Sequence, residues 1–311
     1  MAIWKLQPLM QERIWGGRNL EKLGRLLPEG KKIGESWELV DRHGSQSVVE
    51  GTGESIGSVW SGGSREKIFG RRSPRAEQFP ILIKLLDAEE KLSLQVHPPA
   101  ERANELGGEP KTEMWFFLET KPGAEIYVGL RKGVGKEEFE KALIEGKVSE
   151  CFHRLKMEPG QAMFLPSGRV HAIGAGNVIL EIQQNSDTTY RVDDWGRKDG
   201  KGNSRELHVR EALNSIRWDD VEPACIQPRG ERVLVCDFFK VTRWWLMPGE
   251  VRELVPDAGS FRYLFVAEGK VREEESGEEW LKGSGRFVTA DHPSLILHGV
   301  EESTVVQVEF P

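Results

Sequence analysis

Short apolar runs interrupted by glycine and proline dominate the chain. They are rich in leucine, isoleucine, valine and aromatic side chains, several of which are favoured in strands. The clearest runs lie at 81–86, 92–96, 113–118, 162–166, 178–184, 232–246, 262–269 and 304–310. Many short strands with frequent turn signals are typical of a β-sandwich or barrel. We therefore expect a mainly β protein.

Helical periodicity is clearest in two segments, 99–106 and 136–150. In the second segment, Phe139, Leu143 and Ile144 recur on one helical face. Both segments are short compared with the β-type runs around them. The pattern predicts a small helical component inserted into a β fold.

A change in composition near 219–230, which contains two prolines, separates two β-rich halves. Each half has a Pro-Gly pair followed by apolar residues, in 157–166 and in 246–254. This weak similarity suggests a diverged duplication as a hypothesis. We predict a first domain over 1–225, which includes both helical segments, and a second β domain over 226–311.

Composition narrows the classes of function. The 311 residues carry a formal net charge of −7, which argues against a general nucleic-acid binder because such proteins have a basic surface. The N-terminus lacks a signal-peptide pattern, and no apolar run reaches the roughly 20 residues of a membrane span. The three cysteines are irregularly spaced, so we expect reduced thiols: Cys151, Cys225 and Cys236. We therefore expect a cytoplasmic protein without membrane or nucleic-acid partners.

The segment KLSLQVHPP contains the first candidate chemistry. Strand alternation places Leu92, Leu94 and Val96 on one face. The opposite face carries Ser93, Gln95 and His97. An oxygen donor and an imidazole thus point together into the space that the sheet encloses. Alone, a histidine in this context is more often a structural residue than a metal ligand.

A carboxylate opens the next strand. Alternation groups Lys111, Glu113 and Trp115 on one face, and apolar residues follow directly in the run WFFL. An unpaired carboxylate that enters such a buried run is costly, and a bound cation would remove that cost.

A third segment, GQAMFLPSGRVH, runs from Gly160 to His171. Its glycine, proline and histidine spacing resembles the second signature of the cupin family, in which a Pro-x-Gly turn directs the histidine into the barrel. One departure is that the family's asparagine would fall at Ala175, whereas this chain has Asn177. Together the three segments supply nitrogen and oxygen ligands of the kind that a catalytic zinc site uses.

Gln-x-His-Pro at 95–98 is similar to the motif of the type I phosphomannose isomerases. Further similar segments are RIWGG (13–17), GESWE (34–38), KTEMW (111–115), LPSGRVHAIGAG (165–176) and EIQQNSDTTYRVDDWGR (181–197). The overall length resembles the short bacterial form of the family. The resemblance implies a cupin (jelly-roll) barrel with a small helical insertion and a second, metal-free cupin-like β domain.

The resemblance also implies roles for individual residues. It assigns one zinc ion, or another divalent metal, to four ligands: Gln95, His97, Glu113 and His171. It assigns polar pocket positions to Glu35, Lys84, Lys111 and Glu181, an aromatic wall to Trp15, a catalytic role to Arg191, and a phosphate contact to Arg197. Ile173 and Asp193 replace tyrosines of some relatives, so the shape of the substrate pocket can differ.

The implied activity is the metal-dependent interconversion of mannose 6-phosphate and fructose 6-phosphate through an enediolate, a step of carbohydrate metabolism. Arg191 suits the stabilisation of the developing negative charge. Lys111 is a candidate base if a nearby cation lowers its pKa, while Glu181 and a metal-bound hydroxide are alternatives.

Two other classes of function remain open at this point: a metal-dependent cupin oxygenase and a sugar-binding relative without turnover. Gln95 in place of a histidine argues against the first, and the presence of Arg191 and Lys111 argues against the second. The choice among aldose phosphates, the direction of the reaction and the oligomeric state are not indicated by the sequence.

Overall fold

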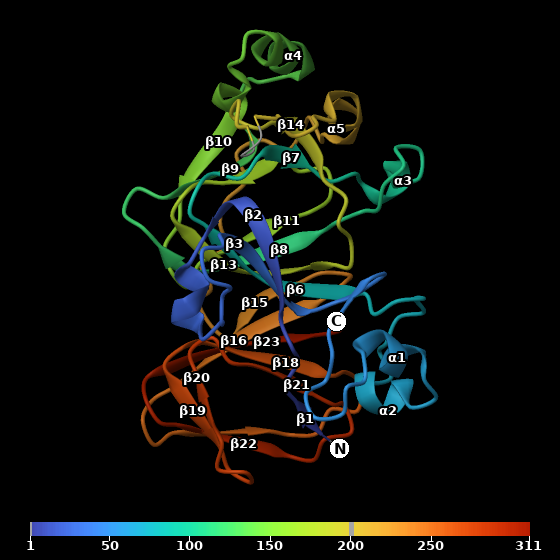
Figure 1. The fold of residues 1–311 in the computed structure, drawn as a ribbon, viewed down its shortest axis with the longest axis vertical. Coiled ribbons are helices and arrows are strands. Elements are labelled where there is room, and N and C mark those ends of the chain that lie inside the picture. Colours follow the sequence, from blue (N-terminus) through green and yellow to red (C-terminus); the bar gives the residue numbers. More distant parts are fainter. Residues whose placement is uncertain (1, 199–201) are drawn as a thin grey trace.

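The computed structural model describes residues 2–198 and 202–311, and within them four large antiparallel sheets are stacked in layers (Figure 1). The upper two layers in Figure 1 have five and six strands, and we call them the site lobe. The lower two layers have six and four strands, and we call them the C-terminal lobe. The mainly β architecture predicted from the sequence is confirmed.

The site lobe places its two sheets face to face. The outer, five-stranded sheet has the order β10 (Phe152–Lys156), β9 (Glu125–Leu130), β12 (His171–Ile173), β7 (Leu94–Val96) and β14 (Tyr190–Asp193). The inner, six-stranded sheet has the order β11 (Ala162–Leu165), β8 (Glu113–Thr120), β13 (Asn177–Gln184), β6 (Ile81–Ala88), β3 (Ile33–Leu39) and β2 (Leu9–Gly17).

The C-terminal lobe repeats the arrangement of two facing sheets. Its six-stranded sheet has the order β1 (Ile3–Trp4), β21 (Gly285–Val288), β18 (Arg262–Glu268), β23 (Ser303–Glu309), β16 (Lys240–Leu246) and β15 (Arg232–Val235). Its four-stranded sheet has the order β17 (Val251–Leu254), β22 (Leu295–Gly299), β19 (Lys270–Glu273) and β20 (Glu279–Leu281). A small hairpin joins β4 (Asp41–Arg42) to β5 (Ser45–Gln46).

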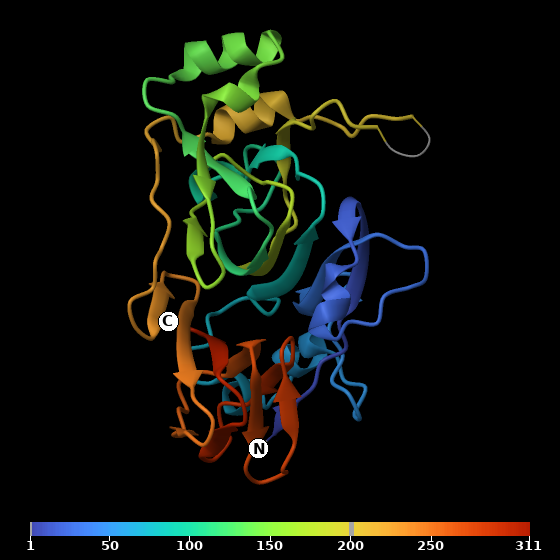
Figure 2. The ribbon, with the colours of Figure 1, turned by 90° about the vertical axis from the view of Figure 1, so that its left-hand side faces the viewer.

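Helices are short and lie at the edges of the stack. The described residues contain α1 (Ile56–Ser61), α2 (Arg65–Phe69), α3 (Ala100–Ala103), α4 (Lys136–Ile144) and α5 (Val209–Ser215), with 3₁₀ turns η1 (Asn19–Leu23) and η2 (Val148–Cys151). Figure 2 shows α4 and α5 above the site lobe and the N-terminal strands, in blue, along one side. Within the described ranges, no helix has the length and apolar character needed to cross a membrane.

Strand alternation gives the inner sheet of the site lobe two different faces. On β6, Ile83 and Leu85 belong to a cluster that also contains Phe265 of β18 and Val306 of β23. Lys84, between them, lines a cavity on the opposite face. The inner sheet therefore uses one face to pack on the C-terminal lobe and the other to build the site.

The two lobes consequently share one hydrophobic core. The first strand adds to this connection, because Ile3 and Trp4 pair with Val288 and Phe287 of β21. The division of the chain near residue 225 stays a prediction. The structure adds that β1 pairs with strands beyond that boundary.

The outer sheet of the site lobe is covered by helices. Leu94 and Val96 pack with Phe139 of α4 and Ala212 of α5, as expected for the apolar face of this strand. Leu92 does not share that face: it lines the cavity instead. The strand begins only at Leu94, so the alternation expected from residue 92 onward was wrong at its first position.

Candidate metal centre and active site

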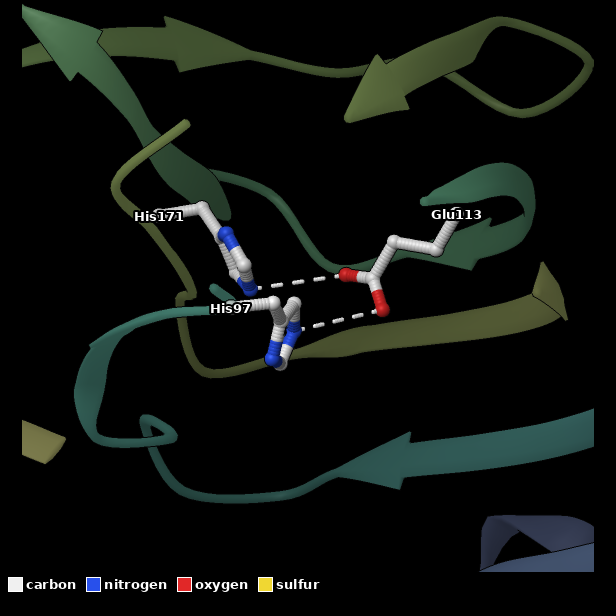
Figure 3. Close-up of side chains that lie close together, drawn as sticks. All are labelled: His97, Glu113 and His171. Atoms are coloured by element: carbon white, nitrogen blue, oxygen red, sulfur yellow. Dashed lines mark ion pairs between the residues drawn. The ribbon is translucent and has the colours of Figure 1, made fainter. Parts of the chain in front are cut away.

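Two histidines and one glutamate meet between the sheets of the site lobe (Figure 3). Nε2 of His97 lies 3.5 Å from Oε2 of Glu113, and Nε2 of His171 lies 3.4 Å from Oε1. The candidate ligand atoms all lie within 4.8 Å of one another. All three side chains are buried. The group therefore has the residue types and spacing of a metal site.

The local fold explains why the histidines converge. His97 follows the end of β7 and His171 begins β12, directly after a tight turn. Gly168 in that turn has φ of +91°, a left-handed conformation that favours glycine. Its backbone N–H donates to the carbonyl of His97 at 2.8 Å. The Pro-x-Gly turn thus ties the two histidine segments together.

Backbone carbonyls select the tautomer of both histidines. Nδ1 of His97 lies 2.8 Å from the carbonyl of Thr188, and Nδ1 of His171 lies 2.9 Å from the carbonyl of Arg169. A carbonyl only accepts, so each Nδ1 carries the proton and donates it. The lone pair of each Nε2 is then directed at the centre of the group, as metal ligation requires.

Burial keeps both imidazoles neutral. It lowers the pKa of His171 to about 3, with a further contribution from His97. Burial and the Lys111 ammonium lower the pKa of His97. A neutral imidazole is the form that binds a metal ion.

Glu113 provides the test of whether a cation fits here. Its two oxygens are buried, and Nε2 of His171 and Nε2 of His97 face them at 3.4 and 3.5 Å. Although burial opposes ionisation, Lys111 and His97 hold the pKa of this carboxyl well below its usual range. The Lys111 ammonium lies 2.7 Å from Oε2 and 3.4 Å from Nε2 of His97. A positive charge is thus attracted to the point where these ligands converge.

Gln95 lies beside the group, with its amide nitrogen toward it. That nitrogen is 3.2 Å from Nε2 of His171, while Ser93 Oγ donates to the amide oxygen at 3.1 Å. Ligation through oxygen would require the amide to turn over. The assignment of Gln95 as a fourth ligand stays a prediction.

A cavity of about 380 Å³ opens above the buried group. Both sheets of the site lobe contribute to its wall. Among the side chains that line it are Trp15, Glu35, Lys84, Gln95, Lys111, His171, Ile173, Glu181 and Arg191. The structure therefore brings nearly all of the residues singled out from the sequence to one place.

Alternating charges line the inner-sheet wall of the cavity. The Lys84 ammonium lies 3.4 Å from Glu181 and 3.9 Å from Glu35. Arg13 forks both oxygens of Glu35 at 3.2 and 3.1 Å. Although burial opposes it, Lys84 and Arg13 lower the pKa of Glu35 to about 2. These charges are therefore compensated within the wall.

Glu181 and Lys111 differ in how their environment changes their pKa. Burial, together with the charges of Glu113 and Glu35, raises the pKa of Glu181 despite the nearby lysines. Although burial opposes it, Glu113 and Glu181 raise the pKa of Lys111. The prediction that a bound cation lowers the pKa of Lys111 stays a prediction. Glu181 has the environment of a proton acceptor of raised basicity.

Arg191 is placed next to the candidate ligands by strand pairing. On adjacent strands, Gln95 is directly opposite both His171 and Arg191, so the three side chains share one face of the outer sheet. The Arg191 guanidinium forms no ion pair or hydrogen bond with the described residues, and its Nε is buried. Burial and the charge of Arg205 lower its pKa. It is a cation that lacks a bonded counter-ion.

Arg197 is not among the side chains that line the cavity. It pairs with Asp194 and donates to the carbonyl of Lys91. Two cavity-lining arginines, Arg13 and Arg205, were missed. Arg13 stands in RIWGG two residues before Trp15, so strand alternation around the predicted Trp15 could have found it. Arg205 follows a polar loop with no periodic signal.

Comparison with known proteins agrees with this geometry. The family model for the catalytic domain of type I phosphomannose isomerase matches residues 3–131. The mannose-6-phosphate isomerase ManA of Bacillus subtilis is 37% identical over 251 residues, which are 76% of this chain and 78% of that protein.

Solved structures give the same result. A crystal structure of the mannose 6-phosphate isomerase from Bacillus subtilis aligns with a TM-score of 0.86 and 30% identity, over 99% of both chains. A mannose 6-phosphate isomerase bound with zinc and yttrium aligns with a TM-score of 0.74 and 18% identity, over 98% of this chain and 99% of that one, and shows the shared fold. The predicted cupin fold is confirmed by these matches.

Proposed function

Because this chain belongs to the type I phosphomannose isomerases, we propose that its cavity interconverts mannose 6-phosphate and fructose 6-phosphate. The reaction moves a proton between C2 and C1 of the open-chain sugar through an enediolate. It needs a base for that proton and positive groups that stabilise the enediolate oxygens. The cavity contains both kinds of group within one enclosure.

His97, Glu113 and His171 would hold one divalent metal ion, with Gln95 as a fourth ligand after its amide has turned. Nitrogen and carboxylate ligands of this kind suit zinc, although other divalent ions share such sites. A bound ion would act as a Lewis acid on the oxygens at C1 and C2 and as a template for the sugar. The proposal is supported by the convergence of two imidazole nitrogens on the buried oxygens of Glu113.

Glu181 is the proton acceptor in this proposal. Trp115 Nε1 donates to one of its oxygens at 3.0 Å, and Lys84 pairs with the other. These contacts orient the carboxylate toward the cavity, while its raised pKa favours proton uptake. Lys111 then serves as a fixed positive charge near the reacting oxygens.

Arg191 stabilises the negative charge that develops on the enediolate. Its guanidinium has no bonded partner in the cavity, so it does not need to break an existing ion pair before it meets the substrate. The remaining predicted contacts place Trp15 against the sugar ring and Glu35 and Lys84 at its hydroxyl groups. The three unpaired cysteines support the cytoplasmic location.

One observation carries the proposal: two buried imidazoles and a carboxylate converge beside a cavity that contains a cation without a bonded anion. The Nε2 atoms of His97 and His171 face the two oxygens of Glu113, and Arg191 lacks a bonded anion. A divalent ion and an oxygen-rich anionic substrate would satisfy both.

A coupled assay tests the proposal directly. Zinc-loaded protein should convert mannose 6-phosphate to fructose 6-phosphate, chelator should abolish this turnover, and added zinc should restore it. Oxygen uptake, followed in the same samples, should stay at the buffer rate. Binding of mannose 6-phosphate without turnover would favour the sugar-binding alternative, and metal-dependent oxygen uptake would favour the oxygenase.

A further inference from the structure

Two arginines hold Asp194 at the rim of the cavity, and only one of them lines it. Arg205 forks the carboxylate, with Nε 2.8 Å from Oδ2 and Nη2 2.5 Å from Oδ1. Arg197 contacts the same carboxylate and the carbonyl of Lys91. Arg205 lines the cavity, whereas Arg197 does not. The shared carboxylate therefore orients Arg205 toward the cavity.

The guanidinium of Arg205 keeps donors available. Asp194 occupies Nε and one N–H of Nη2, and no described residue accepts from Nη1. Arg13, another arginine of the cavity wall, is more fully engaged. Arg13 has Nε and Nη2 on Glu35 and donates from Nη1 to the carbonyl of Glu12.

Positive charge exceeds negative charge at this rim. Arg197 and Arg205 both pair with Asp194, and the charges of Arg205, Asp194 and Asp187 all act on Arg191. An Asp194 carboxylate shared between two guanidinium groups neutralises only one of them. A substrate anion can therefore be accepted without the loss of an existing ion pair.

Arg205 lies nearer to the solvent than the buried candidate metal ligands do. The side chain of Arg205 is 25% exposed, whereas those of Glu113 and His171 are 1% exposed. A sugar phosphate whose C1 and C2 meet the buried ligands would extend its far end toward the rim. The phosphate is carried at C6, the far end of the chain.

We propose that Arg205, positioned by Asp194, binds the phosphate of the sugar substrate, and that Arg197 instead holds Asp194 in place. This inference rests on the proposed function for the identity of the substrate. A guanidinium presents planar pairs of N–H donors that match phosphate oxygens. Arg205 thereby distinguishes phosphorylated from unphosphorylated sugars.

Kinetics and phosphate binding test the inference together. In zinc-loaded protein, Arg205→Ala should raise KM for mannose 6-phosphate about tenfold to a hundredfold, with kcat within about threefold of wild type. The KM of Arg205→Lys should lie between that of wild type and that of Arg205→Ala. Inorganic phosphate, titrated calorimetrically into chelator-treated protein, should bind about tenfold more weakly to Arg205→Ala.

Arg252→Ala is the matched control. Arg252 forks Glu231 at 2.6 and 2.9 Å, and its side chain is 34% exposed, but it lies in the C-terminal lobe. This variant should keep wild-type KM and phosphate affinity. Equal thermal melting of the variants confirms that they are folded.

Three results would overturn the inference. In the first, Arg205→Ala binds phosphate as tightly as wild type. In the second, phosphate binding is weakened more by Arg197→Ala than by Arg205→Ala. In the third, Arg205→Ala loses kcat with KM unchanged, which would make Arg205 a catalytic group. Wild-type protein that binds phosphate through Arg205 without isomerising mannose 6-phosphate would overturn the proposed function and leave the phosphate site standing.

Discussion

The site lobe and the C-terminal lobe each enclose the space between two facing sheets, but they fill it differently. The C-terminal lobe packs apolar side chains there, among them Trp244, Leu264, Trp280, Leu295 and Leu297. The site lobe also has an apolar cluster between its sheets, with Ile126, Ile173 and Ile179. Beside that cluster it encloses charged and titratable groups: Glu35, Lys84, His97, Lys111, Glu113, His171 and Glu181. The same architecture therefore supports a packed core in one lobe and a reactive cavity in the other.

The difference between the two lobes indicates why charged side chains are buried in the site lobe. Apolar packing is sufficient to hold two sheets together, as the C-terminal lobe demonstrates. Burying charges costs free energy that their mutual attraction only partly returns. Their presence in the site lobe is explained by chemistry, and the shared core beneath the inner sheet supplies the stability that this arrangement requires.

The largest effect should come from removing a ligand of the site lobe. His171→Ala should abolish metal binding and lower turnover about a thousandfold or more, because the metal site loses a buried nitrogen ligand. Metal analysis after dialysis and the coupled assay measure both. His298→Ala is the matched control, since His298 pairs with Glu274 on the C-terminal lobe and should leave metal content and activity unchanged. A metal-loaded His171→Ala enzyme would contradict the assignment.

The second-largest effect on turnover should come from Arg191→Ala. It should retain the metal and lower kcat about a hundredfold to a thousandfold, the loss typical when a donor to a developing oxyanion is removed. Arg191→Lys should recover part of that loss because it keeps a positive charge. Steady-state kinetics with metal analysis separate the two effects. Unchanged kcat in Arg191→Ala would refute the role.

A core substitution in the C-terminal lobe should affect stability without affecting chemistry. Leu297 is fully buried between the two sheets, so Leu297→Ala should lower the free energy of unfolding by about 2–5 kcal/mol. Urea denaturation measures this change. The kcat of the folded variant should equal that of wild type. A large fall in kcat would show that the two lobes are coupled more tightly than the comparison suggests.

The smallest expected effect is a pH-dependent change in stability that comes from the ion-paired Glu35 in the cavity wall. The pKa of Glu35 falls from 4.5 to about 2 on folding, so its contribution to stability is full above about pH 4.5 and disappears as the pH falls toward 2. The difference corresponds to about 3 kcal/mol. Urea denaturation at pH 6 and pH 3 should show a steeper loss for wild type than for Glu35→Gln. Parallel losses would contradict the assignment.

Much of the site could be predicted because its chemistry lies in local patterns. Period-2 alternation put Lys111, Glu113 and Trp115 on one face, and all three face the cavity or the candidate ligands. The Pro-x-Gly turn before His171 was visible as spacing. The N-terminal strands β2 and β3 were recognised only as motifs, since polar and small residues interrupt their apolar pattern.

Residue types and spacing along the chain were enough to indicate a β fold and a buried His–Glu–His group, and the resemblance of several motifs indicated an isomerase family. Three further features depend on distances between segments that are far apart in the sequence: the common core of the two lobes, the contact of Lys111 with both Glu113 and His97, and the position of Arg205 on the cavity wall. Packing, burial and ion pairing arise only when those segments meet, because each depends on which groups exclude water from one another.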